Sequence, residues 1–170
     1  MVATQATKEM HYQSSVFREV LVEHLLIGEL LRSLWNHAIP DVEILRSEFD
    51  AGGYDLVLSH RSITRHVQLK SKIVGGSTSS VNISLNLTMK PSGCVLWVEM
   101  TEGMQFHAFR WLGDAPGRPL PDISSYPVTK HTKGNSNGEK LERSNLRKVP
   151  IRAFRKLSTI DEVLSELIGL

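Results

Sequence analysis

Two neighbouring stretches of alternating apolar and polar residues predict a β-hairpin in the first half of the chain. Residues 54–59 and 64–71 are rich in Leu, Val, Ile and Thr, and four residues separate them. With Ser59 opposite Thr64, antiparallel pairing places Asp55 opposite Gln68. One face of this hairpin is apolar, as a sheet that covers a core requires. That face carries Leu56, Leu58, Val67 and Leu69.

A long apolar helix is predicted before the hairpin. Ser14 or Ser15 can cap its start, and Pro40 stops it after about residue 37. At about 100° per residue, a broad apolar stripe forms that we expect to face the sheet. The opposite side is apolar too and needs a cover, either the C-terminal elements or a second subunit. The stripe comprises Val16, Phe17, Val20, Leu21, Ile27, Leu30, Leu31, Leu34 and Trp35, and the opposite side carries Val22, Leu25 and Leu26.

The rest of the pattern predicts further strands and a short helix at the end, which together indicate a mixed α/β fold. A capping box at the start of the last helix and a glycine at its end mark its limits. In chain order we expect a strand at 41–46, a strand or short helix at 81–89, a buried strand at 94–100, a strand at 105–111, and a helix that Ser158 and Asp161 cap and Gly169 ends.

Length and composition favour one domain over residues 1–170. With 170 residues and 41% hydrophobic content, the chain can bury a core of its own. Residues 1–13 are expected to be flexible, and residues 112–150, rich in Gly, Pro, Ser and Asn, to form a long basic loop region. The single cysteine, Cys94, excludes an internal disulfide. No signal-like or membrane-spanning apolar run is present, so the sequence predicts a cytoplasmic protein without membrane contact.

The net charge of +2 conceals an uneven distribution. Nine Lys and Arg but only two Glu lie between Lys130 and Lys156, whereas the remaining residues hold 11 basic and 16 acidic side chains. Such a segment favours contact with a polyanion such as the DNA phosphate backbone, and a solvated basic loop is the equal alternative. The residues expected to contact phosphates are Lys72, Lys130, Lys133, Arg143, Arg147 and Lys148.

Three polar side chains converge on the second face of the hairpin. Gln68 and Lys70 share that face, and Lys70 is the diagonal neighbour of Asp55. Asp55, the Gln68 side chain and the Leu69 carbonyl offer the oxygen ligands that Mg²⁺ prefers. A bound metal would lower the pKa of a water and Lys70 would stabilise the attacking hydroxide, which indicates phosphodiester hydrolysis. An ordinary cross-strand ion pair between Asp55 and Lys70 is the alternative.

Asp55 followed by Gln68-Leu69-Lys70 resembles the D…(E/Q)-x-K signature of the PD-(D/E)XK nuclease superfamily. The approach through Gly52-Gly53-Tyr54, with Gln in place of Glu, is most similar to Mrr-like restriction endonucleases. The resemblance implies a three-layer α/β/α core with a mixed central sheet. It also implies a DNA endonuclease dependent on Mg²⁺ or Mn²⁺, acting in restriction, repair or defence. Because Gln68 removes one negative charge, a weak or inactive nuclease-fold module that binds nucleic acid is the alternative.

The resemblance further implies that an acidic residue of the preceding helix completes the metal site. Glu23 lies at the margin of the predicted stripe and is favoured for this role. Glu29, which precedes Leu-Leu-Arg-Ser-Leu-Trp, is similar to the acid that opens this helix in some superfamily members, but it points away from the stripe. Many restriction-type nucleases are dimers, so a homodimer is a further expectation that the sequence leaves open.

Overall fold

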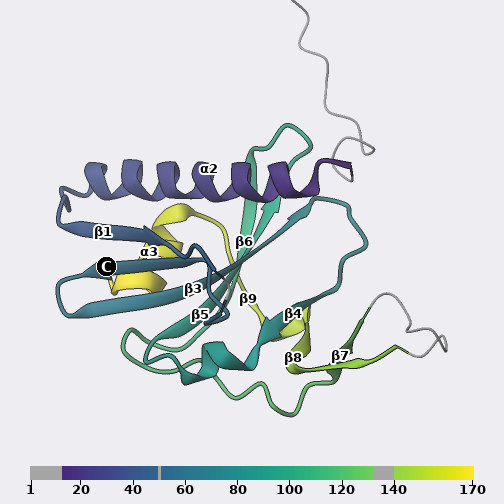
Figure 1. Cartoon of the computed structure of the whole chain (residues 1–170). Coiled ribbons are helices and arrows are strands. Elements are labelled where there is room, and N and C mark those ends of the chain that lie inside the picture. The colour runs from purple at the N-terminus through teal and green to yellow at the C-terminus, as the bar shows by residue number, and fades with distance from the viewer. Residues whose placement is uncertain (1–12, 50, 132–139) are drawn as a thin grey trace, which may run out of the picture.

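The computed structural model describes residues 13–49, 51–131 and 140–170 (Figure 1). None of the helices in these ranges has the length and hydrophobicity needed to cross a membrane. The first half of the chain forms α2 (Ser15–Asn36), β1 (Val42–Arg46), β2 (Leu56–His60), β3 (Ile63–Ile73), β4 (Ser80–Ser84) and the 3-10 helix η1 (Leu85–Met89). The second half forms β5 (Gly93–Met100), β6 (Phe106–Leu112), β7 (Val128–Lys130), β8 (Glu142–Pro150), the 3-10 helix η2 (Ile151–Ala153), β9 (Arg155–Leu157) and α3 (Ile160–Ile168).

A mixed six-stranded sheet in the order β1-β2-β3-β5-β6-β9 forms the centre of the fold. Its strands pair antiparallel except for β3 and β5, which run parallel. The predicted register of the hairpin is confirmed, because Ser59 pairs with Thr64 and Leu56 with Val67. The connecting turn is shorter than predicted, and Arg61 adopts a positive φ of 53° there. The expected α/β class with a mixed sheet is thus found.

Both α-helices of the described residues pack on the same face of this sheet. The core beneath α2 contains Val22, Leu26, Leu30 and Leu34, and α3 adds its own apolar side chains to the same cluster. The predicted stripe of α2 is therefore largely wrong. The helix is apolar nearly all round, so periodicity alone could not decide which side faces the sheet. Five predicted core residues, Val16, Phe17, Val20, Leu31 and Trp35, are instead exposed.

The other face of the large sheet is covered by a smaller antiparallel sheet in the order β4-β8-β7 and by η1 (Figure 1). Trp97 of β5 packs edge-on against Phe154 within this second core. Residues 112–150 are therefore not simply a loop, because they contribute β7 and β8. Residues 81–89 divide between most of β4 and η1, so the strand and helix alternatives each hold for a part. Among the described residues no α-helix covers this face.

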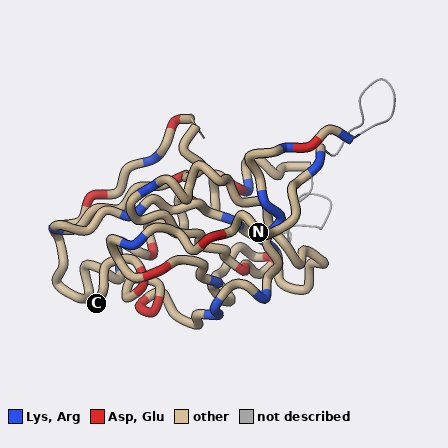
Figure 2. The backbone as a smooth tube through the Cα atoms, turned by 90° about the horizontal axis from the view of Figure 1, so that it is seen from below, with Lys and Arg blue, Asp and Glu red and all other residues tan. Residues whose placement is uncertain are grey.

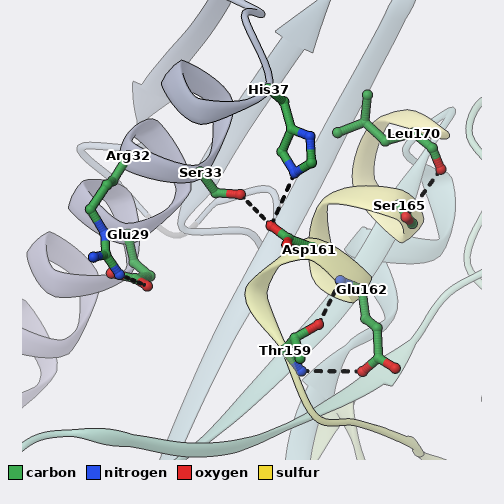
Figure 3. Close-up of polar contacts among 9 residues, drawn as sticks. All are labelled: Glu29, Arg32, Ser33, His37, Thr159, Asp161, Glu162, Ser165 and Leu170. Atoms are coloured by element: carbon green, nitrogen blue, oxygen red, sulfur yellow. Dashed lines mark hydrogen bonds and ion pairs between the residues drawn. The ribbon is translucent and has the colours of Figure 1, made fainter.

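The C-terminal helix begins one residue later than predicted. Its capping box uses Thr159 and Glu162 instead of Ser158 and Asp161: the Thr159 hydroxyl accepts a hydrogen bond from the Glu162 amide, and the Glu162 carboxylate accepts one from the Thr159 amide (Figure 3). Gly169 ends the helix at a φ of 75°, as predicted. Asp161 faces α2, where its carboxylate accepts a hydrogen bond from the Ser33 hydroxyl at 2.5 Å.

Candidate functional site

The candidate site lies where β3 extends beyond its neighbour β2. On this side the described pairing of β3 with β2 ends at Val67, whereas pairing with β5 continues to Ile73. Asp55, just before β2, occupies the vacated edge. Its amide donates to the Val67 carbonyl at 2.9 Å, and its carboxylate Oδ2 accepts from the Leu69 amide at 2.6 Å. Because the N–H and C=O of one strand residue point to the same edge, the Leu69 carbonyl also faces Asp55.

A cavity of about 420 Å³ opens between this edge and the N-terminal half of α2. It collects acidic groups from the helix, the Asp55 carboxylate and the Lys70 ammonium, so four of the predicted site residues meet here, namely Glu23, Asp55, Leu69 and Lys70. Apolar side chains of α2 form the rest of the wall. The lining residues are Val16, Arg18, Glu19, Val20, Val22, Glu23, Asp55, Leu69, Lys70 and Ser71.

A tight turn delivers Asp55 to this position. Gly53 adopts a φ of 73°, a conformation that side chains disfavour. A Cβ atom at Gly53 would lie 2.5 Å from the Cβ of Ser84, so the turn packs directly on the end of β4. Tyr54, the next residue, packs edge-on against the ring of His66, whose pKa is lowered by burial and then by the charge of Lys90. Both the backbone conformation and the packing thus require glycine at position 53.

The two candidate helix acids lie in different places. Glu23 lines the cavity, with a side chain that is 16% exposed and forms an ion pair with Arg46 of β1. Glu29 lies one and a half turns further along α2, pairs with Arg32, and faces a separate polar hollow beside α3. The structure therefore brings Glu23, and not Glu29, to Asp55. Glu19 also lines the cavity and was not singled out from the sequence, although it lies one helical turn before Glu23.

Gln68 is buried at 3% exposure beside the site. Its side-chain oxygen Oε1 accepts no hydrogen bond from any described residue, an arrangement that costs free energy in the absence of a partner. Gln68 does not line the cavity, in contrast to its neighbours Leu69 and Lys70. The predicted opposition of Gln68 and Asp55 follows the observed register, since Leu56 pairs with Val67.

The donors around the cavity fit a hard divalent cation by their chemistry. The Asp55 and Glu23 carboxylates and the Leu69 carbonyl are oxygen ligands of the kind that Mg²⁺ and Mn²⁺ accept. Within the described ranges, no group of three or more His, Cys, Asp or Glu side chains is close enough to hold a metal. Glu23 would also have to leave Arg46 to act as a ligand. A cation would therefore rely on two carboxylates, backbone oxygen and water.

A second, basic cavity of about 650 Å³ adjoins the first, and Lys70 lines both. It lies between β3 and the smaller sheet, whose β7 and β8 carry several Lys and Arg (Figure 2). Lys140 lines it as well, although this residue of the basic segment is not among the predicted phosphate contacts. The full lining is Lys70, Ser80, Val81, Asn82, Val128, Thr129, Lys130, His131, Lys140 and Lys148.

The predicted phosphate contacts divide between this cavity and other places. Lys130 and Lys148 line it, and Arg143 lies on an exposed part of β8 outside it. Arg147 donates instead to backbone carbonyls, including that of Ser124. Lys133 lies outside the described residues.

Lys72 does not support the prediction of a phosphate contact. Its side chain is only 13% exposed, its ammonium lies 3.7 Å from the carboxylate of Glu99, and it sits over the ring of Trp97. Glu99 also pairs with Arg110. Lys72 therefore belongs to a largely buried charge cluster with Glu99 and Arg110, none of which lines the basic cavity.

Comparison of the chain with family models, with curated proteins and with solved structures finds no match. No relative thus assigns a role to Asp55, Glu23 or Lys70, and their placement alone carries the functional argument. That placement combines two features: a cavity in which Asp55 at a strand edge meets Glu23 of α2, and a basic cavity that shares Lys70 with it.

Proposed function

We propose that the protein is a metal-dependent nuclease that hydrolyses phosphodiester bonds in DNA. One observation carries the proposal: the acidic cavity that holds Asp55 and Glu23 and the basic cavity that holds Lys130 and Lys148 share Lys70. Hydrolysis of DNA needs both cavities: basic side chains to bind the charged phosphate backbone, and carboxylates to hold the metal that activates the attacking water. A binding surface for polyanions alone would have no use for the acids.

Each group in the cavity has a distinct role in this proposal. Asp55 and Glu23, with the Leu69 carbonyl, hold Mg²⁺ or Mn²⁺, which when bound lowers the pKa of a water and offsets phosphate charge. The Leu69 amide donates to Oδ2 of Asp55 and so holds the carboxylate at the cavity wall. Lys70 donates to the phosphate oxygens and stabilises the charge that develops on them. Lys130, Lys140 and Lys148 position the neighbouring phosphates of the strand.

The core of the fold corresponds, in this proposal, to that of restriction-endonuclease-like enzymes. The order α2, β1, β2 and β3, followed by the parallel strand β5, supports it. In place of a second helical layer, η1 and the smaller sheet cover the other face. The same small sheet forms one wall of the basic cavity, so it would contribute to substrate binding as well as cover the core.

Cleavage of supercoiled plasmid DNA in the presence of Mg²⁺, Mn²⁺ or a chelator tests the proposal. Asp55→Asn keeps an oxygen that can accept from the Leu69 amide but removes the charge, so we expect a folded protein that has lost cleavage. Lys70→Ala should lose at least about a hundredfold in rate. Lys156→Ala, at an exposed position of β9 outside both cavities, is the matched control and should cleave normally.

Full cleavage by Asp55→Asn would overturn the assignment. Glu23→Gln against Glu43→Gln separates the helix acid from a neighbouring exposed acid of β1, and only the first should lower the rate. Cleavage that persists in chelator would exclude the metal from the reaction. Melting temperatures of all variants, measured without metal, would show that a loss of rate is not a loss of fold.

A nucleic-acid-binding module without catalysis is the second candidate. The ion pair of Glu23 with Arg46 favours it, because a carboxylate already neutralised binds a cation less readily, and Gln68 supplies no charge. The two candidates differ in their response to metal. A nuclease site should show a metal-dependent rise in melting temperature that Asp55→Asn removes, whereas a binding module should bind DNA equally well in chelator.

A further inference from the structure

The outward face of α2 carries large apolar side chains that no described residue covers. Phe17 is 63% exposed, Val20 42%, Leu31 48% and Trp35 78%. At about 100° per residue these four fall on one narrow strip, on the side of the helix opposite the buried Leu26. His24 and Gly28 complete this α2 outer strip, and no charged residue interrupts it. Contiguous apolar patches of this kind mark interaction sites.

The spacing of the strip is self-complementary. Along the helix, Phe17 and Trp35 lie equally far from Leu26, and His24 and Gly28 also lie equally far from it. Val20 and Leu31 deviate from the same symmetry by one residue. When two identical helices pack antiparallel about a two-fold axis, residues equidistant from the axis face each other. Phe17 of one copy would therefore meet Trp35 of the other, and His24 would meet Gly28.

The structure offers room for both contacts. Beside the C-terminal end of α2, an apolar hollow of about 380 Å³ is lined by Trp35, Ala38, Ile39 and Pro40. The Phe17 ring of a second copy would arrive at this level of the helix. At the centre, a Cβ atom built on Gly28 would contact nothing within 4 Å, which leaves space for a facing His24 ring. Aromatic side chains that fill apolar hollows provide most of the binding free energy in many interfaces.

We propose that the α2 outer strip is the interface of a homodimer, in which α2 packs antiparallel on α2 of a second copy. The strip, with two aromatic and two aliphatic side chains and His24 in each copy, would bury roughly 1,000 Å² in total, about the minimum for a biological interface and the size of a weak dimer that dissociates on dilution. Because the strip carries no charged side chain, a second copy of the same strip can pack against it without like charges meeting. The proposal does not rest on nuclease activity, and the two sites share only Val20, which lies at the margin of the strip and lines the acidic cavity as well.

Sedimentation velocity of the full chain over a range of micromolar concentrations tests the interface. We expect a dimer that dissociates on dilution. Phe17→Glu and Trp35→Lys should each weaken dimerisation about a hundredfold, since an aromatic anchor is lost twice in a symmetric interface. Phe49→Glu, which changes a 75% exposed aromatic residue outside the strip, is the control and should leave the dimer intact.

Mixing the two variants tests the register itself. Phe17→Glu mixed with Trp35→Lys should restore a dimer, because one end of the helix pair then joins Glu to Lys while the other keeps Phe17 against Trp35. A parallel arrangement predicts no rescue, since residue 17 would face residue 17. Since both side chains are exposed, unchanged melting of the monomeric variants would show an intact fold. A wild-type chain that stays monomeric, or a mixture without rescue, would overturn the proposal.

Discussion

Arg65 lies wholly inside the protein, with no exposed surface, although its charge has no carboxylate partner among its hydrogen bonds. Its guanidinium donates to the carbonyls of Glu166 and Leu167, at the C-terminal end of α3, and to that of Asp114. It also lies over the ring of Trp111 at 5.3 Å. Burial lowers the pKa of Arg65. One side chain thereby satisfies the unpaired carbonyls of a helix end and complements its dipole.

Replacing Arg65 should destabilise the fold strongly. Arg65→Met leaves buried carbonyls without donors, each worth about 1–3 kcal/mol, so we expect a loss of at least about 3 kcal/mol. Arg65→Lys should recover only part of it, because an ammonium cannot reach diverging acceptors as a guanidinium does. Urea unfolding measures the change, with the exposed Arg118→Met as control. A loss below about 1 kcal/mol would show that water replaces the guanidinium.

Asp161 gives the stability of the protein a dependence on pH. Hydrogen bonds from the Ser33 hydroxyl and then from His37 lower the pKa of this carboxyl below its ordinary value of 3.8 (Figure 3). A depressed pKa in the folded state stabilises the fold fully above the ordinary pKa, and this contribution disappears as pH falls through the folded pKa. Asp161→Asn should therefore flatten the decline in melting temperature at acid pH. Glu43→Gln, an exposed acid on β1, should leave that decline unchanged.

At the scale of elements, the cap of α3 distinguishes two neighbouring hydroxyl residues. Thr159→Ala should destabilise the protein by about 1 kcal/mol, because its side chain accepts from the Glu162 amide and anchors the first turn. Ser158→Ala should have almost no effect, since only the backbone amide of Ser158 donates to Glu162. Thermal unfolding of the two variants makes the comparison. Equal losses would show that the cap is shared between both residues.

The same contrast shows what sequence patterns can predict for this chain. The register of the hairpin can be predicted because Ser59 and Thr64 lie on either side of a short turn. The alternation of apolar and polar residues then fixes which side chains share a face. The predicted cap lies one residue before the observed one. Ser158 and Thr159 both carry a hydroxyl that can cap a helix, and only the path of the folded backbone decides which of them does. Arg65 was missed, although its place on the face of Val67 and Leu69 marks it as an inward-facing charge.

Long-range pairing accounts for the remaining failures. β8 is mostly exposed and polar, so no alternation marks it as a strand, and its partners β4 and β7 lie far from it or are very short. The basic cavity could therefore not be predicted from the sequence, although the charge of the segment that carries most of its lysines could. Asp55, Gln68 and Lys70 are predicted from a motif within one hairpin, and Glu23 is favoured over Glu29 from its position on α2. Glu23 lines the cavity although the predicted stripe is largely wrong, because the packing of Leu26 and Leu30 decides the rotation of the helix.

At the scale of the whole molecule, the proposed nuclease function assigns substrate binding to the small sheet and the chemical step to the cavity between the large sheet and α2. Asp55 at the edge of the large sheet and Glu23 of α2 line one cavity, Lys130 and Lys148 of the small sheet line the other, and Lys70 lines both. Under the proposed nuclease function, variants of the small sheet should therefore alter substrate affinity and leave the chemical step unchanged. Variants of Asp55 and Glu23 should slow the chemical step and leave substrate affinity unchanged. Lys70→Ala should change both substrate affinity and the chemical step.

Lys148→Ala tests this division most directly. Its side chain lines the basic cavity from exposed strand β8, so the fold should tolerate the change. Loss of one phosphate contact should weaken DNA binding and reduce the slope of log affinity against log salt by about 1. In cleavage, KM should rise while kcat is retained, because the contact is made equally before and during the reaction. Lys156→Ala should keep the wild-type salt slope, and a fall in kcat for Lys148→Ala with unchanged KM would instead place Lys148 among the groups that stabilise the transition state.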